Sequence, residues 1–281
     1  TYNLAIGRKG NPGSVFKTAI LMSVMEDVGV KLSDEIPTEG GDVKIAKIKP
    51  DVHVRDYERK TGRKTMTVRK GYEMSSNYIF QRLVKDNYAS EPKKLIDNLY
   101  RYRFGEAFDF DLQGLATPVL PSPDSEHWTM TDLASVAIGY AVAETPLHIL
   151  TFYNAIANKG RMMRPYIVES VEKDGRIVKK KGPSVLNGAV CSREVADSLT
   201  SGLLSITSEG TASRLKDAKL RVAGKTGTAW VYMDPKQASR TDPFMDREGR
   251  RKYQATFVGF FPAEQPKYTA IVVIYSKPSN E

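Results

Sequence analysis

Residues 13–29 read GSVFKTAILMSVMEDVG, a tight turn followed by a long apolar run that closes at a second glycine. Asn11-Pro12-Gly13 is a turn signal, and the run over 15–28 predicts a buried helix. Ser14 stands in the first turn of this helix, among unpaired backbone N–H groups and at the positive end of the helix dipole. Those groups favour negative charge, such as that of a serine alkoxide or a tetrahedral oxyanion.

Ser14 and Lys17 form a Ser-x-x-Lys pair, and three-residue spacing places both side chains on one helical face, with Cβ atoms about 5–6 Å apart. The motif alone is weak, because copies start at Ser14, Ser90, Ser170 and Ser213. The last three lie at a helix start, in a hairpin strand and after a Gly-Thr-Ala turn, so the setting favours the first. A lysine with its ordinary pKa near 10.4 is a poor base, but burial and a second cation would both favour its neutral form.

Two further motifs follow in order. Ser75-Ser76-Asn77 lies near the start of a helix expected over 72–84, and Lys225-Thr226-Gly227-Thr228-Ala229 lies on a strand expected over 220–232. Gly227 within a strand predicts close approach of another backbone or a ligand. Lys-Thr-Gly also occurs at Lys60, but the segment 55–64 is so highly charged that we expect a surface loop there. Together the motifs can form a serine acyl-transfer site that needs no histidine.

The remaining pattern predicts helices followed by a late antiparallel sheet. Further helices are expected over 92–102, 130–138, 145–159 and 192–208, a hairpin over 166–180 around Asp174-Gly175, and strands over 255–261 and 268–276. This order indicates an α/β (α+β) fold with one sheet between helical layers.

The chain has 281 residues, 41% of them hydrophobic, and a net charge of +9. No apolar run reaches the roughly 18 residues that span a membrane, and we expect no signal peptide within these residues. Basic clusters over 55–70 and 173–181 suit solvated loops, an anionic wall polymer, a membrane surface or nucleic acid. They lack aromatic interleaving and match no nucleic-acid motif, so we expect no nucleic-acid partner.

Composition also bears on cofactors. His53, His127 and His148 are far apart without metal spacing, and no Gly-rich phosphate loop occurs. We therefore expect neither a metal nor another cofactor. Cys191 is the single cysteine, so no intramolecular disulfide forms, and we expect it to be a small buried residue.

The three motifs, in this order, resemble those of the penicillin-binding protein family, most closely its class B peptidoglycan D,D-transpeptidases. Further similar segments are Ala137-Ile138-Gly139-Tyr140, Thr145-Pro146-Leu147, Glu209-Gly210-Thr211-Ala212 and Ala255-Thr256-Phe257-Val258-Gly259-Phe260-Phe261-Pro262-Ala263. The resemblance covers nearly the whole chain. It implies the transpeptidase fold shared by penicillin-binding proteins and serine β-lactamases.

Two departures concern the ends. Catalytic domains of the family normally have a longer stretch before the nucleophile and a helix after the last strand, whereas thirteen residues precede Ser14 and the chain stops at Glu281. We therefore expect residues 1–281 to be a transpeptidase domain truncated at both ends, without the N-terminal pedestal and membrane anchor of the class. The resemblance implies a site of action on the extracytoplasmic, periplasmic face of a bacterial inner membrane, through an anchor segment absent from this chain.

The resemblance also implies roles in forming the acyl-enzyme. Ser14 would attack the carbonyl of a D-Ala-D-Ala stem peptide and expel D-alanine, with Lys17 as the base. Ser75 would relay the proton to the leaving amine. Asn77 would hydrogen-bond Lys17 and the substrate amide.

A second set of residues would hold the substrate. Lys225 would supply positive charge, the hydroxyls of Thr226 and Thr228 would bind the substrate carboxylate, and Gly227 lies between them on the same strand. The backbone N–H groups of Ser14 and Thr228 would form an oxyanion hole, in which one donor is typically worth about 2.7–4 kcal/mol of the barrier.

The fate of the acyl group separates several activities. An amine from a second stem peptide gives a cross-link, whereas water gives a D,D-carboxypeptidase or a β-lactamase. No glutamate stands in a context that marks a hydrolytic water, so we expect a transpeptidase that β-lactams acylate. A β-lactam sensor or a non-catalytic division scaffold is a further alternative. Expected partners are stem peptides, β-lactams, and wall-synthesis or divisome proteins that include a glycosyltransferase.

Overall fold

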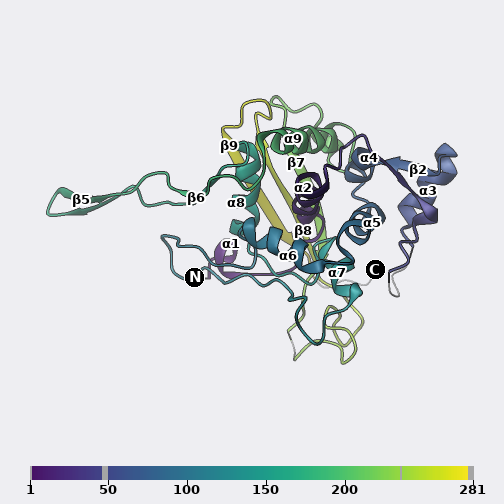
Figure 1. The fold of residues 1–281 in the computed structure, drawn as a ribbon. Helices are drawn as coiled ribbons and strands as arrows, with labels where there is room; N and C mark the ends of the chain where they lie inside the picture. The colour runs from purple at the N-terminus through teal and green to yellow at the C-terminus, as the bar shows by residue number, and fades with distance from the viewer. Residues whose placement is uncertain (1, 46–49, 235, 278–281) are drawn as a thin grey trace.

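A computed structural model gives the structure of residues 2–45, 50–234 and 236–277, with most helices gathered beside one antiparallel sheet (Figure 1). In this part of the chain the sheet consists of β7 (Ala223–Trp230), β8 (Tyr253–Phe261) and β9 (Tyr268–Tyr275), in that spatial order. The three strands lie within the segments expected from the sequence or extend them by two residues at most. The expected mixed helix-and-sheet class is confirmed.

The helices that cover the sheet and surround the motifs come from the first 210 residues. They are α1 (Leu4–Gly7), the 3-10 turn η1 (Gly13–Phe16), α2 (Lys17–Val28), α3 (Val52–Thr61), α4 (Val68–Glu73), α5 (Asn77–Tyr88), α6 (Pro92–Arg101), α7 (Met130–Val136), α8 (Pro146–Ala157) and α9 (Arg193–Ser208). Short 3-10 turns also occur at Glu39–Gly41 and Ser213–Leu215. Within the described residues, none of the helices has the length and apolar character needed to cross a bilayer.

The helix expected over 15–28 is present as α2 and runs through the core. Its residues from Lys17 to Met25 are buried, and Ile20, Leu21 and Val24 are fully enclosed. Gly29 ends the helix in a left-handed conformation with φ of 71°, which glycine adopts without steric cost. α2 packs against α5, α6 and α9, so its first turn is held at the centre of the molecule.

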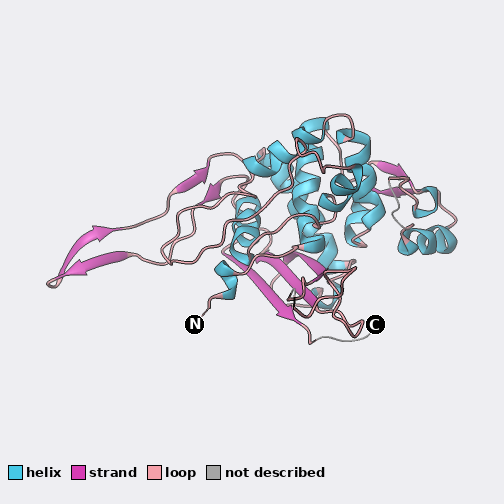
Figure 2. Cartoon of the chain, turned by 90° about the horizontal axis from the view of Figure 1, so that it is seen from below, coloured by secondary structure: helices cyan, strands magenta, loops and turns pink. Residues whose placement is uncertain are grey.

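Helices α8 and α9 pack on the sheet, and Figure 2 shows the helices gathered on one side of it. On the helix-facing side Ala223, Val258 and Phe260 are fully buried. On the opposite face Val272 and Ile274 of β9 remain exposed. The alternation follows from the two-residue period of a strand, which sends successive side chains to opposite faces.

The helix expected over 72–84 is wrong as a single element. The structure has α4 and α5 with a break at Met74–Ser76, and Ser75 adopts a left-handed conformation with φ of 55°. Ser76 is the N-cap of α5, and its hydroxyl accepts a hydrogen bond from the backbone N–H of Ile79 at 3.3 Å. Serine competes for backbone hydrogen bonds in this way, which ends one helix and starts the next.

The loop expected over 55–64 is also wrong, because the segment forms α3. Asp51 caps its N-terminus, and Gly62 ends it with φ of 67°. Val54 is buried, but Lys60 and its neighbours are exposed, so the segment is a surface element as expected. Because the segment carries so many charged residues, the sequence pattern does not reveal the two capping residues, Asp51 and Gly62.

Pairs of short strands lie outside the main sheet. They are β1 (Glu35–Pro37) with β2 (Thr65–Thr67), β3 (Met162–Met163) with β6 (Val185–Asn187), and β4 (Ser170–Lys173) with β5 (Arg176–Lys180). The β4–β5 hairpin turns at Asp174-Gly175 as expected and projects far from the body (Figure 1). Asp111 holds its base by accepting hydrogen bonds from Ile167 and Val168 at 2.7 and 2.9 Å and from Lys181.

A close backbone contact braces the turn before α2. The N–H of Gly13 donates to the carbonyl of Gly139 at 3.0 Å. Gly139 has φ of 79°, and a Cβ atom there would lie 2.1 Å from the Gly13 carbonyl oxygen. The contact therefore requires glycine for both its conformation and its lack of a side chain.

The variant Gly139→Ala tests this brace against the matched control Gly114→Ala, whose glycine has φ of 92° but nothing within 4 Å of a Cβ. Both variants carry the cost of a left-handed alanine, about 1–2 kcal/mol. Overpacking should make Gly139→Ala less stable than the control by a further 1–3 kcal/mol or so, measured by denaturant unfolding. Equal losses in the two variants would contradict the brace.

Candidate active site

The turn that carries Ser14 lies directly against strand β7. A Cβ atom at Gly227 would meet the backbone N of Val15 at 3.1 Å and the carbonyl oxygen of Pro12 at 3.2 Å. A Cβ atom at Gly13 would meet the carbonyl oxygen of Thr228 at 2.7 Å. The close approach predicted at Gly227 is thus confirmed, and the approaching backbone is that of the serine turn.

Ser14 lies in η1 and Lys17 begins α2, with the N–H of Lys17 bonded to the carbonyl of Ser14. In a 3-10 turn the side chains three residues apart are eclipsed, so both leave the same side of the chain. The Ser14 side chain is partly exposed, whereas Lys17 is fully buried. The arrangement places a partly exposed serine on the same side of the chain as a fully buried lysine.

The amine of Lys17 is surrounded by acceptors from the break between α4 and α5. It donates to the carbonyl oxygen of Ser75 at 2.6 Å and to Oδ1 of Asn77 at 2.7 Å, and it lies 3.4 Å from Oγ of Ser75. The left-handed conformation of Ser75 turns this carbonyl toward α2. The expected contact between Asn77 and Lys17 is therefore confirmed.

A second buried amine reaches the same serine from the sheet. Lys225 on β7 is fully enclosed, and its Nζ donates to Oγ of Ser75 at 2.8 Å and to the carbonyl oxygen of Thr226 at 2.9 Å. The Ser75 hydroxyl thus lies between two lysines that are 208 positions apart in the sequence. The other Lys-Thr-Gly copy, at Lys60, is exposed at the end of α3.

Burial changes the acid–base chemistry of both amines. Loss of hydration lowers the pKa of Lys17 to about 7, although the negative charge of Asp51 acts in the opposite direction. Burial first, and then the positive charge of Lys17, lower the pKa of Lys225 well below its usual value. Near neutral pH the cluster can therefore hold a neutral amine, which ordinary surface lysines cannot.

Two residues outside the three motifs support the cluster. Thr211 shares a hydrogen bond of 2.7 Å between its hydroxyl and that of Thr226. Asp51 accepts a hydrogen bond from the hydroxyl of Ser76 at 2.9 Å. Thr211 lies in one of the segments that carried the family resemblance, whereas Asp51 could have been noticed as a helix-capping residue before an amphipathic stretch.

Aromatic side chains surround the end of β7, beyond the exposed Thr228. The backbone N–H of Trp230 donates to the hydroxyl of Tyr140 at 3.1 Å, and the guanidinium of Arg251 lies 4.1 Å from the centre of the Trp230 ring. Phe244 packs on the Trp230 ring at a centroid distance of 5.9 Å. These rings form an apolar wall at the open end of the strand.

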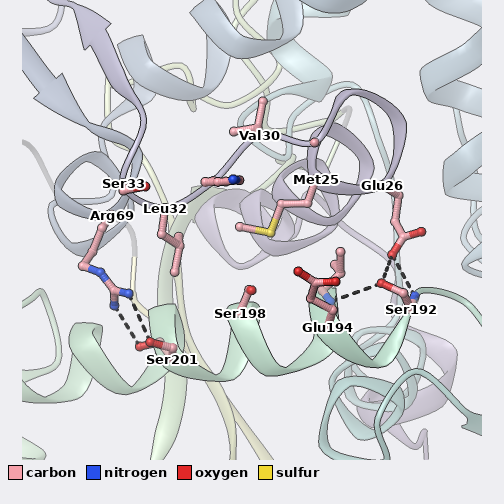
Figure 3. Close-up of a pocket in the computed structure, with 13 residues that line it drawn as sticks. Met25, Glu26, Val30, Leu32, Ser33, Arg69, Ser192, Glu194, Ser198 and Ser201 are labelled. Atoms are coloured by element: carbon pink, nitrogen blue, oxygen red, sulfur yellow. Dashed lines mark hydrogen bonds between the residues drawn. The ribbon is translucent and has the colours of Figure 1, made fainter.

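A groove of about 670 Å³ lies at the other end of α2 and contains none of the motif residues. Its walls come from the C-terminal part of α2, the following loop and α9 (Figure 3). Arg69 and Glu26 are already engaged there, with Ser201 and Ser192 respectively. In the described part of the chain, no three His, Cys, Asp or Glu side chains gather in a group that could hold a metal ion.

Comparison with known proteins gives a consistent result. The family model described as "Penicillin binding protein transpeptidase domain" matches residues 1–281. Stage V sporulation protein D of Bacillus subtilis is 27% identical over 97% of this chain and 39% of its own length. Peptidoglycan D,D-transpeptidase FtsI of Buchnera aphidicola is 24% identical over 96% of this chain and 42% of its own length. The chain thus spans about two fifths of the length of these relatives.

Solved structures extend the likeness to the fold. Penicillin binding protein 3 of Mycobacterium tuberculosis is similar with a TM-score of 0.79 and 23% identity, over 99% of this chain and 59% of that one. The same protein complexed with ampicillin is similar with a TM-score of 0.79 and 23% identity, over 98% of this chain and 58% of that one. At this identity the comparison establishes the fold alone.

The buried amine of Lys17 predicts how stability depends on pH. Its pKa is about 7 in the folded chain, so between about pH 7 and 9 the unfolded chain binds a proton that the folded chain lacks. The free energy of unfolding should therefore gain a contribution that rises with pH, at about 1.4 kcal/mol per unit. Below pH 7 both states hold the proton and the contribution to the slope disappears.

Denaturant unfolding at several pH values, compared between the wild type and Lys17→Met, measures this contribution, because groups other than Lys17 and the coupled Lys225 cancel. In the variant, the free energy of unfolding should rise less steeply with pH, by about 1.4 kcal/mol per pH unit, which corresponds to one proton. Parallel curves for the two proteins would mean that Lys17 keeps its proton throughout the range.

Proposed function

The chain belongs to the penicillin-binding protein transpeptidase family, and we propose that residues 1–281 are the catalytic domain of a peptidoglycan D,D-transpeptidase that forms an acyl-enzyme on Ser14. The observation that carries the proposal is the meeting of Lys17 and Lys225 at the Ser75 hydroxyl, beside the turn that presents Ser14. A lone Ser-x-x-Lys would not support it, because the chain contains four.

In the proposed acylation, Oγ of Ser14 forms a bond to the carbonyl carbon of the penultimate D-alanine. Its proton passes to the neutral amine of Lys17, whose lowered pKa suits it to act as a base near neutral pH. The resulting oxyanion is stabilised by the backbone N–H groups of Ser14 and Thr228. The close packing of these two backbones supports this pairing.

The carbon–nitrogen bond then breaks and the terminal D-alanine leaves as an amine, which must gain a proton. Ser75 is suited to pass it on, because its Oγ lies 3.4 Å from Nζ of Lys17 and 2.8 Å from Nζ of Lys225. Asn77 keeps the amine of Lys17 in place and would also bind the substrate amide. The proton thus moves from Ser14 to the leaving group without a histidine.

Substrate binding would restore the charge of Lys225. A carboxylate close to a buried amine favours its protonated form and raises its pKa, which opposes the effect of burial. The D-alanine carboxylate would lie at the exposed side of β7, with the hydroxyls of Thr226 and Thr228 as donors. Thr226 already shares a hydrogen bond with Thr211, which orients its hydroxyl.

In the second half-reaction an amine of a neighbouring stem peptide would attack the acyl carbon, release Ser14 and form the cross-link. The names of the relatives support transfer to an amine rather than to water. β-Lactams would acylate Ser14 in the same way, which the complexes of a similar protein with ampicillin and aztreonam support. No cofactor enters this scheme.

The setting of the reaction is part of the proposal. We place it on the periplasmic face of a bacterial inner membrane, with a pedestal and an anchor segment outside residues 1–281. Wall-synthesis or divisome partners that include a glycosyltransferase are proposed on the same basis. A similar solved structure is described as the D,D-transpeptidase domain of a peptidoglycan glycosyltransferase from Eggerthella lenta, with 25% identity.

Ser14→Ala tests the nucleophile against Ser90→Ala, which removes the serine of a second Ser-x-x-Lys at an exposed helix start. Fluorescent penicillin should label the wild type and Ser90→Ala equally and should not label Ser14→Ala, because the proposed acyl bond forms on the Ser14 hydroxyl. Gel fluorescence followed over hours measures both the attachment of the fluorescent label and its later loss from the protein. Label that decays within seconds would instead indicate a β-lactamase, and label retained by Ser14→Ala would contradict the assignment.

Lys225→Met tests the role of the strand lysine, with Lys60→Met as the control at the exposed Lys-Thr-Gly copy. Loss of the buried amine should slow acylation by about 10²–10³-fold, the range seen when one preorganised donor is removed. Lys60→Met should react at the wild-type rate. Equal rates for the two variants, measured by stopped-flow or quenched labelling, would remove Lys225 from the mechanism.

A further inference from the structure

The carboxylate of Asp51 lies behind the Ser75-Ser76-Asn77 turn and binds it at two points. Its Oδ2 accepts hydrogen bonds from Oγ of Ser76 at 2.9 Å and from the backbone N–H of Tyr78 at 3.2 Å. Its Oδ1 accepts a hydrogen bond from the backbone N–H of His53 at 2.9 Å. One carboxylate therefore joins the N-terminus of α3 to the start of α5.

Asp51 is itself fixed by its backbone. Its N–H donates to the carbonyl of Gly41 at 2.9 Å. Gly41 has φ of 79°, and a Cβ atom there would lie 2.5 Å from the carbonyl oxygen of Asp51. The carboxylate is thus held by a tight contact on one side and by α3 on the other, so it can act as a fixed point for the turn.

The turn needs such a fixed point because its geometry is unfavourable for serine. Ser75 has φ of 55°, a conformation that residues other than glycine rarely adopt. Asp51 binds the residue after Ser75 and the residue after Asn77. Its two bonds therefore hold the residues that directly follow the two side chains that meet Lys17 and Lys225.

Asp51 also supplies negative charge to the cluster. Among the described residues, neither Lys17 nor Lys225 forms an ion pair with a carboxylate. The charged or titratable groups that face Lys17 are the amine of Lys225 on β7 and the more distant Asp51 before α3. The neutral groups are Ser75 in the turn and the side chains of Asn77 and Phe80 on α5. The carboxylate partly offsets the effect of burial on the pKa of Lys17.

We propose that Asp51 is a positioning residue of this site, which holds the Ser75-Ser76-Asn77 turn against the two buried lysines through its bonds to Ser76 and Tyr78. It does not touch the reacting atoms and acts through the turn. The inference rests on the proposed acyl transfer for its catalytic consequence, but the positioning itself is a structural claim that can be measured without catalysis.

Asp51→Asn is the primary test, because asparagine keeps the size of the side chain but removes its charge and replaces one acceptor by a donor. The rate of acylation by fluorescent penicillin should fall by about 10²-fold, as expected when reacting groups move by about 1 Å. The acid limb of the rate profile should move to lower pH, because loss of the negative charge lowers the pKa of Lys17 further. Hydrogen exchange at the Tyr78 amide should become at least about tenfold faster.

Two further variants separate positioning from general destabilisation. Val54→Ala removes buried volume from α3 and leaves the Asp51 bonds intact, so it should lower stability without changing the rate profile or the Tyr78 exchange. Asp51→Glu keeps the charge but displaces the oxygens, so it should keep the acid limb near the wild-type pH while the rate falls. It also serves if Asp51→Asn does not fold.

A wild-type rate together with unchanged Tyr78 exchange, in a folded Asp51→Asn or Asp51→Glu protein, would overturn the inference. A loss of rate shared by Val54→Ala would overturn it as well, since that is the signature of a structural effect. If the wild type is not labelled at all, the proposed function fails. The Tyr78 exchange then still decides whether Asp51 holds the turn.

Discussion

The burial of two lysine side chains at one place constrains the structure around them. An ammonium group without water is costly unless it is hydrogen-bonded or loses its proton. Lys17 meets that requirement with oxygens of Ser75 and Asn77 at 2.6 and 2.7 Å, and Lys225 with Ser75 and Thr226 at 2.8 and 2.9 Å. The same burial that threatens stability produces the lowered pKa values on which the proposed chemistry depends. The break between α4 and α5 at Ser75 places acceptor oxygens close to both amines.

Backbone packing brings these groups together from three distant parts of the chain. The serine turn touches β7 where Gly227 lacks a side chain, and Gly139 supports the turn from the other side. Because these contacts join rigid backbones rather than flexible side chains, they fix where Ser14 stands relative to Thr228. Asp51 gives the Ser75-Ser76-Asn77 turn a comparable anchor. The site is thus a product of the core, and its geometry and the stability of the fold are linked.

Much of this could be predicted from the sequence, and the failures have physical causes. The helix after Ser14, the hairpin at Asp174-Gly175 and the close approach at Gly227 follow from local signals that tertiary packing reinforces. The sequence does not reveal the break at Ser75, because the apolar period continues through it and long-range bonds to the two lysines and to Asp51 stabilise its conformation. The helix α3 is not evident from the sequence, because the many charged residues suggest a loop although Asp51 and Gly62 cap the helix. Asp51 could not be assigned to the site, since nothing local reveals its bond to Ser76.

The proposed acyl transfer depends above all on the proton affinity of Lys17 in the folded protein, which can be measured. Lysine labelled with ¹³C at the ε-carbon gives one resonance per side chain, and the resonance lost in Lys17→Met identifies the one required. We expect a midpoint at about pH 7 for Lys17 in the unliganded protein. A midpoint near the ordinary lysine value of about 10.4 would contradict it, because the amine would then be charged under working conditions and unable to accept the serine proton.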